Sequence, residues 1–340
     1  MPAKLPNRVL ELLYDRAGEF TWFDELADAA GNDPSALDAA LAELARRGHE
    51  LERNPARGVR LVRPTVLDAH LIERDLPTRR IARHVICFAE VDSTNDVAFA
   101  SAAQGGEASG LVVTAEFQRA GRGRLGRKWI CPSGAGILAS VLLGDDRGEP
   151  ASEPITIAAG LAVAEGIELA VGLPTQLEWP NDITVDRAKV AGVLVETRLA
   201  RAAAEDGQSG RRRTVVGFGI NVSAAPTAGV TGRGATCLAE ATGRPQLERI
   251  EILRQVLIRM DHWIEQIRGD GADRLHEAWL GRCGMLNRRL TVRSDGRRVT
   301  GRVLDVNPLT GLVLLADSGE QLHLSAETST VEYQSDIGSS

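Results

Sequence analysis

Residues 121–129 combine the two residue types best suited to binding an anion. Between the apolar runs 111–117 and 137–143, this segment holds three glycines together with Arg122, Arg124, Arg127 and Lys128. Glycine lets the backbone approach a ligand closely and adopt positive φ, while arginine and lysine supply charge and hydrogen-bond donors for a phosphate. We therefore expect a loop that closes over a phosphate or phosphate ester; the alternative is a solvated basic loop.

Two generic phosphate-binding motifs overlap this segment, and neither fits its context. The three glycines match the dinucleotide-binding pattern, which requires a helix directly afterwards and an acidic residue about twenty positions further on. The segment that follows is predicted to be a strand, and Asp145 falls in a turn-like stretch. The P-loop pattern also fails, because Arg127 and Lys128 replace its closing Lys-Ser/Thr pair and remove the magnesium-binding hydroxyl.

Short polar side chains follow another apolar run, at residues 85–89. Ser93, Thr94 and Asn95 come next in the chain, and their hydroxyl and amide groups suit a neutral polar ligand. The alternative is that Asp92 or Ser93 simply caps a helix that runs from Asn95 to Ala103.

Residues 179–196 hold further candidates for the same site. Pro180 excludes a central strand at Trp-Pro-Asn-Asp 179–182, so these residues form either a kinked strand end facing a site or a simple turn. Lys189 begins an apolar run. A lone lysine there is weak evidence for a functional site, because its aliphatic part can lie on apolar surface while its amine stays in solvent. Gly192 inside that run, and the glycine-punctuated run 216–222 that contains Asn221, indicate close approach of backbone or ligand.

The elements that must position these residues alternate between helical and β patterns over residues 67–280, which predicts an α/β domain. Helical patterns over 155–171 and 249–268 supply its packing layer. Residues 201–213 are small, polar and turn-prone, so we expect a mobile hairpin loop between the strands at 193–197 and 214–218.

Residues 1–65 predict three helices followed by a hairpin, the element order of a winged helix-turn-helix. Asp33 is a favourable N-cap and Pro34 a favourable first residue for the third helix. Nine Lys/Arg face eleven Asp/Glu over residues 1–63, so only local basic groups could contact DNA phosphates. The candidates for this contact are Arg46, Arg47, Arg53 and Arg57. The alternative is a winged helix used for packing or dimerisation.

Residues 285–333 change character and predict short strands separated by Asp-Gly, Asn-Pro and Ser-Gly turns, which is typical of a small β-barrel. The last residues, 335–340, are expected to be disordered.

Composition sets outer limits on function. The 340 residues carry a net charge of −6, which gives no global attraction to nucleic acid. No apolar run approaches a membrane span and no secretory pattern opens the chain, so a cytoplasmic protein is expected. Four scattered cysteines and six histidines lack metal-ligand spacing, so no resident metal is expected.

Five motifs then occur in a specific order along the chain. They are Asp-Ser-Thr-Asn at 92–95, Gln-x-x-Gly-Arg-Gly-Arg-x-Gly-Arg-x-Trp at 118–129, Trp-Pro-Asn-Asp at 179–182, Lys-x-Ala-Gly-x-Leu-x-Glu at 189–196 and Gly-x-Gly-Ile-Asn-Val at 217–222. Each alone is weak to moderate, but in this order they resemble the biotin protein ligase family over nearly the whole chain. The two terminal parts resemble those of bifunctional bacterial members, which ligate biotin and also repress the biotin operon.

The resemblance implies an α/β (α+β) multidomain fold. Its implied parts are a winged helix-turn-helix at 1–65, a catalytic domain with a mixed sheet at 66–281, an SH3-like β-barrel at 282–334 and a disordered tail at 335–340.

The resemblance also implies a role for individual residues. Biotin is implied to bind Ser93, Thr94, Asn95, Gln118, Arg122, Gly123, Arg124 and Lys189. ATP or the adenylate is implied to contact Gly121, Arg124, Arg127, Lys128, Trp129, Asn181, Asp182 and Asn221. Arg124 is expected beside the activated carboxylate and Lys189 at the carboxylate and α-phosphate, which makes them the implied catalytic residues. Residues 223–240 correspond to a segment that folds over the adenylate.

Two residues depart from the family pattern. Glu178 precedes Trp-Pro-Asn-Asp where a lysine is expected, so one cation near the phosphates is missing or comes from elsewhere. Leu125 replaces a second arginine of the loop, which should matter less.

The implied activity is a two-step ligation with biotin and ATP as substrates and Mg²⁺ bound mainly to the triphosphate. The implied partners are a biotin carboxyl carrier domain of the acetyl-CoA carboxylase type, operator DNA and a second copy of the chain. Two alternatives stay open: a lipoate-type protein ligase on the same scaffold, and a winged-helix regulator that senses a ligand without ligase activity.

Overall fold

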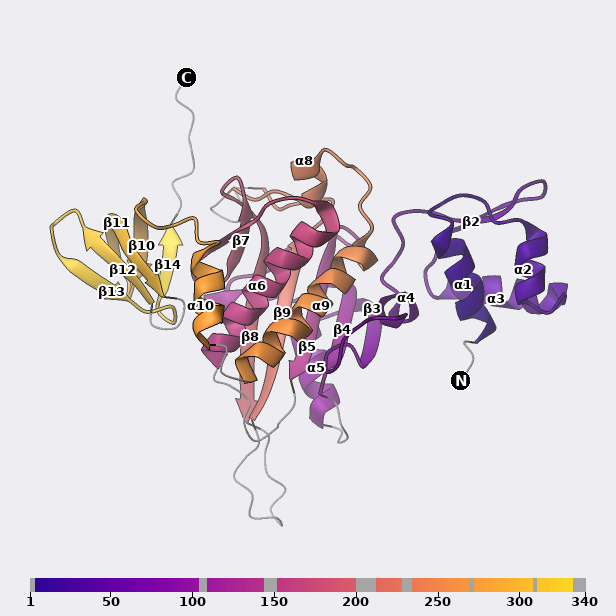
Figure 1. The fold of residues 1–340 in the computed structure, drawn as a ribbon, viewed down its shortest axis with the longest axis horizontal. Coiled ribbons are helices and arrows are strands. Elements are labelled where there is room, and N and C mark those ends of the chain that lie inside the picture. The colour runs from indigo at the N-terminus through magenta and orange to yellow at the C-terminus, as the bar shows by residue number, and fades with distance from the viewer. Residues whose placement is uncertain are drawn as a thin grey trace, which may run out of the picture.

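The computed structural model describes residues 4–103, 109–143, 152–199, 212–227, 234–268, 272–307 and 311–332. These residues form three parts arranged in a row along the longest axis of the molecule (Figure 1). A central mixed α/β part lies between a helical N-terminal part and a C-terminal antiparallel sheet.

The N-terminal part contains the predicted helices and hairpin. Its elements are α1 (Leu5–Asp15), α2 (Phe23–Ala29), α3 (Pro34–Arg46), β1 (Leu51–Asn54) and β2 (Gly58–Leu61). Asp33 caps α3 as expected, because its carboxylate accepts hydrogen bonds from the backbone N–H groups of Ser35 and Ala36. Leu10 and Leu41 are among the fully buried side chains that hold the helices together.

A seven-stranded mixed sheet forms the centre of the described chain, in the order β3-β4-β5-β9-β8-β7-β6. Only β3 and β4 run parallel; the other neighbours are antiparallel. The strands are β3 (His84–Val91), β4 (Leu111–Gln118), β5 (Gly136–Leu143), β6 (Gln176–Glu178), β7 (Asp182–Val185), β8 (Ala188–Leu199) and β9 (Arg212–Asn221). The predicted α/β character is confirmed, and β8 and β9 form the expected hairpin. The predicted loop 201–213 is too long at its end, because Arg212 and Arg213 already pair with β8 as part of β9; residues 200–211 lie outside the described residues.

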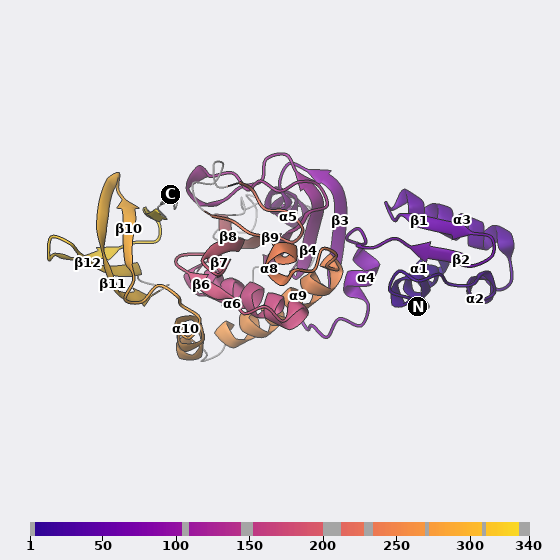
Figure 2. The ribbon, with the colours of Figure 1, turned by 90° about the horizontal axis from the view of Figure 1, so that it is seen from above.

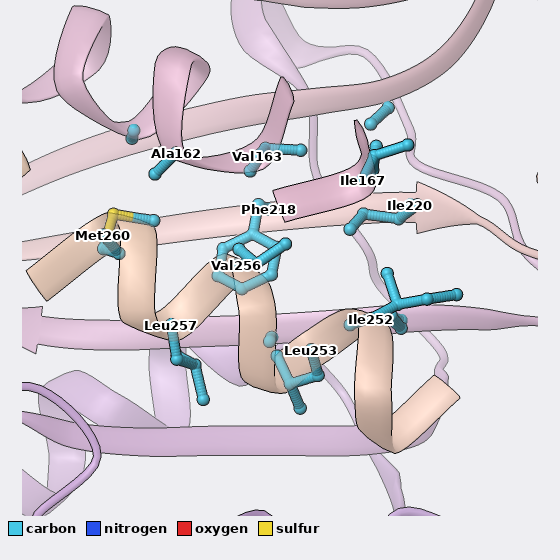
Figure 3. Packing of buried hydrophobic residues seen from close by; sticks show 14 of the residues in the cluster. Ala162, Val163, Ile167, Phe218, Ile220, Ile252, Leu253, Val256, Leu257 and Met260 are labelled. Atoms are coloured by element: carbon cyan, nitrogen blue, oxygen red, sulfur yellow. The ribbon is translucent and has the colours of Figure 1, made fainter. Parts of the chain in front are cut away.

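Helices cover both faces of this sheet. On one face lie α6 (Ser152–Val171) and α9 (Arg249–Arg268), side by side in both ribbon views (Figures 1 and 2). Val256 of α9 and Phe218 of β9 meet in the core between them (Figure 3). The other face carries α5 (Thr94–Ala103), which packs on Val113 and Leu142. Shorter helices are α4 (Ala69–Glu73), α8 (Leu238–Thr242) and α10 (Ala272–Leu280).

The expectation that no apolar run approaches a membrane span is wrong when judged by length and hydropathy. Within the described residues, one helix is long and apolar enough to cross a membrane, over Pro154–Val171 in α6. However, 67% of that stretch is buried inside the protein, against α9 and the sheet. Its hydropathy is that of a central core helix packed on several sides.

The C-terminal part is a five-stranded antiparallel sheet within the described residues, in the order β13-β12-β11-β10-β14. Its strands are β10 (Arg289–Ser294), β11 (Arg297–Asn307), β12 (Gly311–Ala316), β13 (Gln321–Leu324) and β14 (Ser329–Glu332). The Asp295-Gly296 turn that joins β10 to β11 has both residues at positive φ, as the Asp-Gly signal predicts. Val292 and Val303 are fully buried in its small core.

Candidate active site

A cavity of about 790 Å³ lies where the central part meets the C-terminal sheet. The N-terminus of α5, the loop between β4 and β5, the β6–β7 turn and strands β8 and β9 all contribute to its wall. It is lined by the predicted residues Ser93, Thr94, Asn95, Gln118, Arg122, Gly123, Arg124, Arg127, Lys128, Trp129, Asn181, Asp182, Lys189 and Asn221. Side chains from five separate places in the sequence are thus brought to one site.

Gly121 is the predicted nucleotide residue that does not line the cavity. Its carbonyl accepts a hydrogen bond from the N–H of Trp129 at 3.0 Å. A Cβ at this position would lie 2.6 Å from the carbonyl oxygen of Trp129. Glycine is therefore needed here to let the two ends of the loop approach each other.

One end of the cavity is a buried polar pocket at the N-terminus of α5. Ser93, Thr94 and Asn95 are each at most 4% exposed. The backbone N–H of Thr94 donates to the Gln118 side chain at 2.8 Å. The hydroxyl of Ser140, on β5, donates to the amide oxygen of Asn95 at 2.6 Å. These contacts fix the polar groups in place, as a pocket for a small neutral ligand requires.

Ser140 and Glu196 do not line the cavity but hold the pocket residue Asn95 in place, and neither was predicted as a site residue from the sequence. The amide of Asn95 donates to the carboxylate of Glu196 at 2.6 Å. Ser140 did carry a signal, since it is the single polar residue in the apolar run of β5 and is fully buried. A buried hydroxyl needs a hydrogen-bonding partner, which points to a polar pocket against that strand.

Arg122 is tied into an acidic network instead of being available for a phosphate. Its guanidinium donates to Asp96 at 2.6 and 3.0 Å and to Glu196 at 3.1 Å. The hydrogen bond to Asp96 raises the pKa of Arg122 above its usual value, and the same bond lowers the pKa of Asp96. Arg122 therefore anchors the loop to α5 and β8.

The centre of the loop folds back on itself. Gly123 N–H donates to the carbonyl of Arg127 at 2.7 Å, around a short 3₁₀ turn over Arg124–Gly126. Leu125 and Gly126 both have positive φ there. The guanidinium of Arg124 hydrogen-bonds the carbonyl of Ala326 in the C-terminal part, and burial lowers the pKa of Arg124. The loop is thus held from both sides of the cavity.

Trp129 forms the floor beside the loop. Its indole lies on two strand glycines: a Cβ on Gly219 would be 2.3 Å from the ring, and one on Gly192 would be 3.4 Å away. The Trp129 indole N–H and the Asn221 amide oxygen are buried and have no hydrogen-bonding partner among the described residues. Unpaired buried polar groups are costly, so these two groups mark a place where the wall of the cavity is not at its most stable.

The β6–β7 turn and the start of β8 bring together a carboxylate and an amine. The residues 179–181 form the turn, so both readings of Trp-Pro-Asn-Asp hold: it is a turn, and it faces the cavity. Lys189 Nζ lies 2.6 Å from Asp182 Oδ1 and 5.4 Å from the centre of the Trp129 ring. Residues 234–236 run beside Lys189, bonded to its backbone at 3.0 and 3.1 Å, whereas residues 228–233 of the expected covering segment lie outside the described residues.

Glu178, which departs from the family pattern, lies outside the cavity wall. Its carboxylate is fully buried and pairs with Arg288 at 3.1 Å. In contrast, Arg293, Arg298 and Glu332 of the C-terminal sheet do line the cavity. Local sequence gave no signal for these residues, because the fold of the whole chain brings them to the site.

The four candidate DNA-contacting arginines each have a partner in the N-terminal part. Arg46 pairs with Glu43 at 2.5 Å and Arg53 with Asp38 at 2.9 Å. Arg47 pairs with Asp68, and Arg57 lies 4.3 Å above the centre of the Phe20 ring.

Comparisons with known proteins identify the family of this chain. The family described as Biotin/lipoate A/B protein ligase matches residues 87–210. A bifunctional ligase/repressor BirA of Bacillus subtilis is 28% identical over 330 residues, covering 96% of this chain and 99% of the relative. A biotin--[acetyl-CoA-carboxylase] ligase of Paracoccus denitrificans is 30% identical over 243 residues, covering 70% and 97%. The structure of the Aquifex aeolicus biotin protein ligase in complex with biotin and ATP aligns with a TM-score of 0.59 and 27% identity, covering 73% of this chain and 98% of the other. The chain belongs to the biotin protein ligase family.

Proposed function

We propose that this chain joins biotin to a lysine of a biotin carboxyl carrier domain in two steps, through biotinyl-5′-AMP. The observation that carries the proposal is the composition of one cavity wall. A buried neutral polar pocket and a cationic glycine-rich loop share the same space. Such a site suits a ligand that is polar and neutral at one end and anionic at the other.

The first step needs the biotin carboxylate beside the α-phosphate of ATP. The ureido ring of biotin would occupy the pocket of Ser93, Thr94, Asn95 and Gln118, which points its carboxylate toward the loop. A carboxylate oxygen attacks the α-phosphorus, the bond to the bridging oxygen breaks, and pyrophosphate leaves. Charge grows on the phosphoryl oxygens in this step, so preorganised cations such as Lys189 and Arg124 lower its barrier.

The second step needs protection from water before the acceptor arrives. Biotinyl-5′-AMP is a mixed anhydride, and a loop that closes over it excludes water. The ε-amine of the acceptor lysine then attacks the acyl carbon, and AMP leaves as an amide forms. The nucleophile belongs to the partner protein, so this chain needs no nucleophilic side chain of its own.

Arg124 is expected to keep the intermediate in place. Its contact with the Ala326 carbonyl joins the loop to the C-terminal part. Arg124→Ala would remove this contact and also the contact of the guanidinium with the anhydride. We expect this variant to keep its fold but to release biotinyl-5′-AMP into solution. Retention of the adenylate on a size-exclusion column, at the wild-type level, would contradict this role.

Mg²⁺ would enter the site with the triphosphate. No cluster of three metal-ligating side chains occurs among the described residues, while the cavity wall offers the single carboxylates of Asp182 and Glu332. Mg²⁺ commonly binds through substrate phosphates and one or two carboxylates. When bound, it would neutralise charge on the β- and γ-phosphates as pyrophosphate departs.

We also propose the finer division of the fold and a second role. Residues 1–65 would be a winged helix, 66–281 the catalytic domain and 282–334 an SH3-like barrel, in a cytoplasmic protein that forms homodimers. The Bacillus subtilis relative is named a ligase/repressor, which supports operator binding by the N-terminal part. Failure of the biotin- and ATP-loaded protein to shift its own biotin-gene promoter would remove this second role.

One experiment separates ligation from the alternatives. Biotin-dependent exchange of pyrophosphate into ATP, followed by mass spectrometry of a carrier domain incubated with biotin, ATP and Mg²⁺, should show exchange and the added biotinyl mass. A ligand sensor without ligase activity gives no exchange. A lipoate-type ligase gives exchange with lipoate in place of biotin.

A further inference from the structure

Charged side chains form a cluster where α5, β8 and the cationic loop meet. The two oxygens of Asp96 accept from the guanidinium of Arg122 at 2.6 and 3.0 Å, and one of them also accepts from Arg198 at 2.7 Å. Glu196 accepts from Arg122 at 3.1 Å. Glu196 and Arg198 are two residues apart on β8, so both lie on the same face of that strand.

The cluster balances its own charge, because it joins two guanidinium groups to two carboxylates. Of its four described members, Arg122 lines the cavity, whereas the other three lie outside the cavity wall. An anion that drew Arg122 away would leave the carboxylates of Asp96 and Glu196 without this partner, which is unfavourable. The charge of Arg122 is therefore used for contacts within the protein.

The cluster is fixed to the helix that also carries the polar pocket. Asp96 directly follows the pocket residue Asn95 in the first turn of α5, and the amide of Asn95 donates to Glu196 at 2.6 Å. The guanidinium carbon of Arg198 lies 4.0 Å from the centre of the Phe99 ring, which is buried on the same helix. These contacts give the Asp96 carboxylate a defined position relative to the pocket.

Arg122 transmits this position to the rest of the cationic loop. Its backbone forms an antiparallel bridge with Lys128, and the N–H of the next residue, Gly123, donates to the carbonyl of Arg127 at 2.7 Å. The loop is thus a small hairpin in which Arg122 faces Lys128. Holding the Arg122 side chain therefore also places the two cations on the opposite arm of the hairpin.

We propose that Asp96 is a positioning residue, which holds the Arg122 guanidinium and thereby keeps the cationic loop over the cavity for as long as biotinyl-5′-AMP is bound. The proposal deepens the ligase function and rests on it. A guanidinium that bonds both oxygens of one carboxylate is fixed in orientation as well as in distance. A loop that is already in position loses less conformational freedom when a ligand binds. Asp96 itself lies outside the cavity wall, so it acts through Arg122 and not on the ligand.

The test compares Asp96→Asn with Arg119→Gln as a matched control. Asp96→Asn removes the charge at almost constant size. We expect it to speed up the release of labelled biotinyl-5′-AMP, chased with an excess of unlabelled compound, by about threefold to tenfold. Arg119 also bonds two carboxylates, Asp92 at 2.7 Å and Glu90 at 2.5 Å, but it lies outside the cavity wall. Arg119→Gln should release the adenylate at the wild-type rate.

A double-mutant cycle separates positioning from a simple effect on the helix. Asp96→Asn also weakens α5 itself, because a carboxylate in the first turn stabilises a helix N-terminus. If Asp96 acts through Arg122, the double variant Asp96→Asn/Arg122→Gln should release the adenylate no faster than Arg122→Gln alone. Accelerations that multiply in the double variant would overturn the proposal and confine the role of Asp96 to α5.

The remaining outcomes are distinct. An unchanged rate of release in Asp96→Asn overturns the proposal. Arg122→Lys decides the question even if Asp96→Asn does not fold: an ammonium cannot form the paired bonds of the guanidinium fork, so this variant should release the adenylate as fast as Arg122→Gln. A rate near that of wild type would show that only the charge at position 122 matters, which overturns the proposal.

Failure of the ligase function itself would be seen separately. Absence of biotin-dependent pyrophosphate exchange in the wild type defeats that function, whereas the release of synthetic biotinyl-5′-AMP still measures the effect of Asp96 on the loop.

Discussion

Lys189 is held in a position that favours phosphate chemistry. Asp182 lies 2.6 Å from its amine, and the Trp129 ring lies beneath it. A lysine is a compact charge on a flexible stem, so these two neighbours restrict where the charge can be. Its backbone is fixed as well, since both its N–H and its carbonyl bond to residues 234–236.

Lys189→Ala should nearly abolish adenylate formation while leaving the fold intact. Loss of one preorganised donor to a developing oxyanion typically costs about a hundredfold to a thousandfold in rate. Rapid-quench measurement of biotinyl-5′-AMP gives this rate directly. Asp182→Asn is the matched variant. It keeps the Lys189 amine but removes the ion pair that positions it, so the loss of adenylation rate should be smaller than in Lys189→Ala. Normal adenylation in Lys189→Ala would remove Lys189 from the catalytic step.

Gly217→Ala should damage the biotin end of the cavity alone. A Cβ at this position would lie 2.3 Å from the amide oxygen of Asn95, so Asn95 must move away from Ser140 and Glu196. We expect the Kd for biotin to rise by about tenfold or more, as measured by calorimetry. The Kd for ATP in the same variant is the internal control and should be unchanged. Equal loss of both affinities would mean that the substitution disturbs the whole sheet.

Sequence patterns identified most of this site because its residues lie in short motifs. The basic loop and the Ser-Thr-Asn cluster stand out locally, whereas Lys189 is a weak signal alone and was identified through the ordered set of motifs; all of them line the cavity. Ion pairs between side chains that are distant in the sequence could not be predicted from these motifs, because they form only when the chain folds. Arg122 looks like a phosphate ligand in the sequence, yet Asp96 and Glu196 neutralise it only because α5 and β8 meet beside the loop.

At the scale of elements, the sheet is positioned by the close contact of α6 and α9. A Cβ on Gly166 of α6 would lie 2.6 Å from the Cα of Val256 in α9, so glycine lets the two helices approach closely at this point. Both helices were predicted from their apolar patterns, with α9 at the expected bounds. Their close approach was not predictable, because the pattern describes each helix alone and the contact needs the pair.

Gly166→Ala should destabilise the central part by about 1–3 kcal/mol, since overpacking pushes two helices apart. Gly160→Ala in the same helix is the matched control: its new Cβ would meet only the side chain of Leu177, at 3.6 Å. Replacing a glycine inside a helix is then neutral or stabilising by about 0.5–1 kcal/mol. Denaturant unfolding of both variants measures the difference. Equal stabilities would show that α6 and α9 adjust freely to the added methyl group.

At the scale of the whole molecule, buried charges connect the N-terminal part to the central one. Arg249 of α9 is 4% exposed, and its guanidinium bonds Glu116 of β4 and the carbonyl of Thr65. Glu248 accepts from Thr65 at 2.7 Å. Glu116 lies two residues before Gln118 of the polar pocket, so the linker between the two parts is held by the strand that also serves the site.

Asp68 is a second connection, and it is sensitive to pH. One of its oxygens caps α4 by accepting from the N–H of His70 at 3.0 Å, and the other accepts from Arg47 Nε at 3.0 Å. His49 Nε2 lies 3.1 Å from that second oxygen. Burial opposes the charged carboxylate, but the hydrogen bond to His49 and the charge of Arg47 outweigh it and lower the pKa of Asp68 to about 2.

This lowered pKa predicts how stability depends on pH. An unfolded aspartate has a pKa of about 3.9, so the folded protein gains stability from Asp68 above about pH 4 and loses it as the pH falls toward 2. Asp68→Asn, which keeps a helix-capping oxygen, should therefore cost about 2–3 kcal/mol at pH 6. Near pH 2 most of the difference from wild type should disappear, because the unfolded aspartate is then almost fully protonated and about half of the folded Asp68 side chains are protonated as well. Measuring the free energy of unfolding of both proteins between pH 6 and 2 tests this, since protonation of the other carboxylates affects the two alike. A difference that stays constant over this range would mean that the charge of Asp68 contributes nothing, and that Arg47 and His49 contact this side chain without stabilising the junction between the two parts.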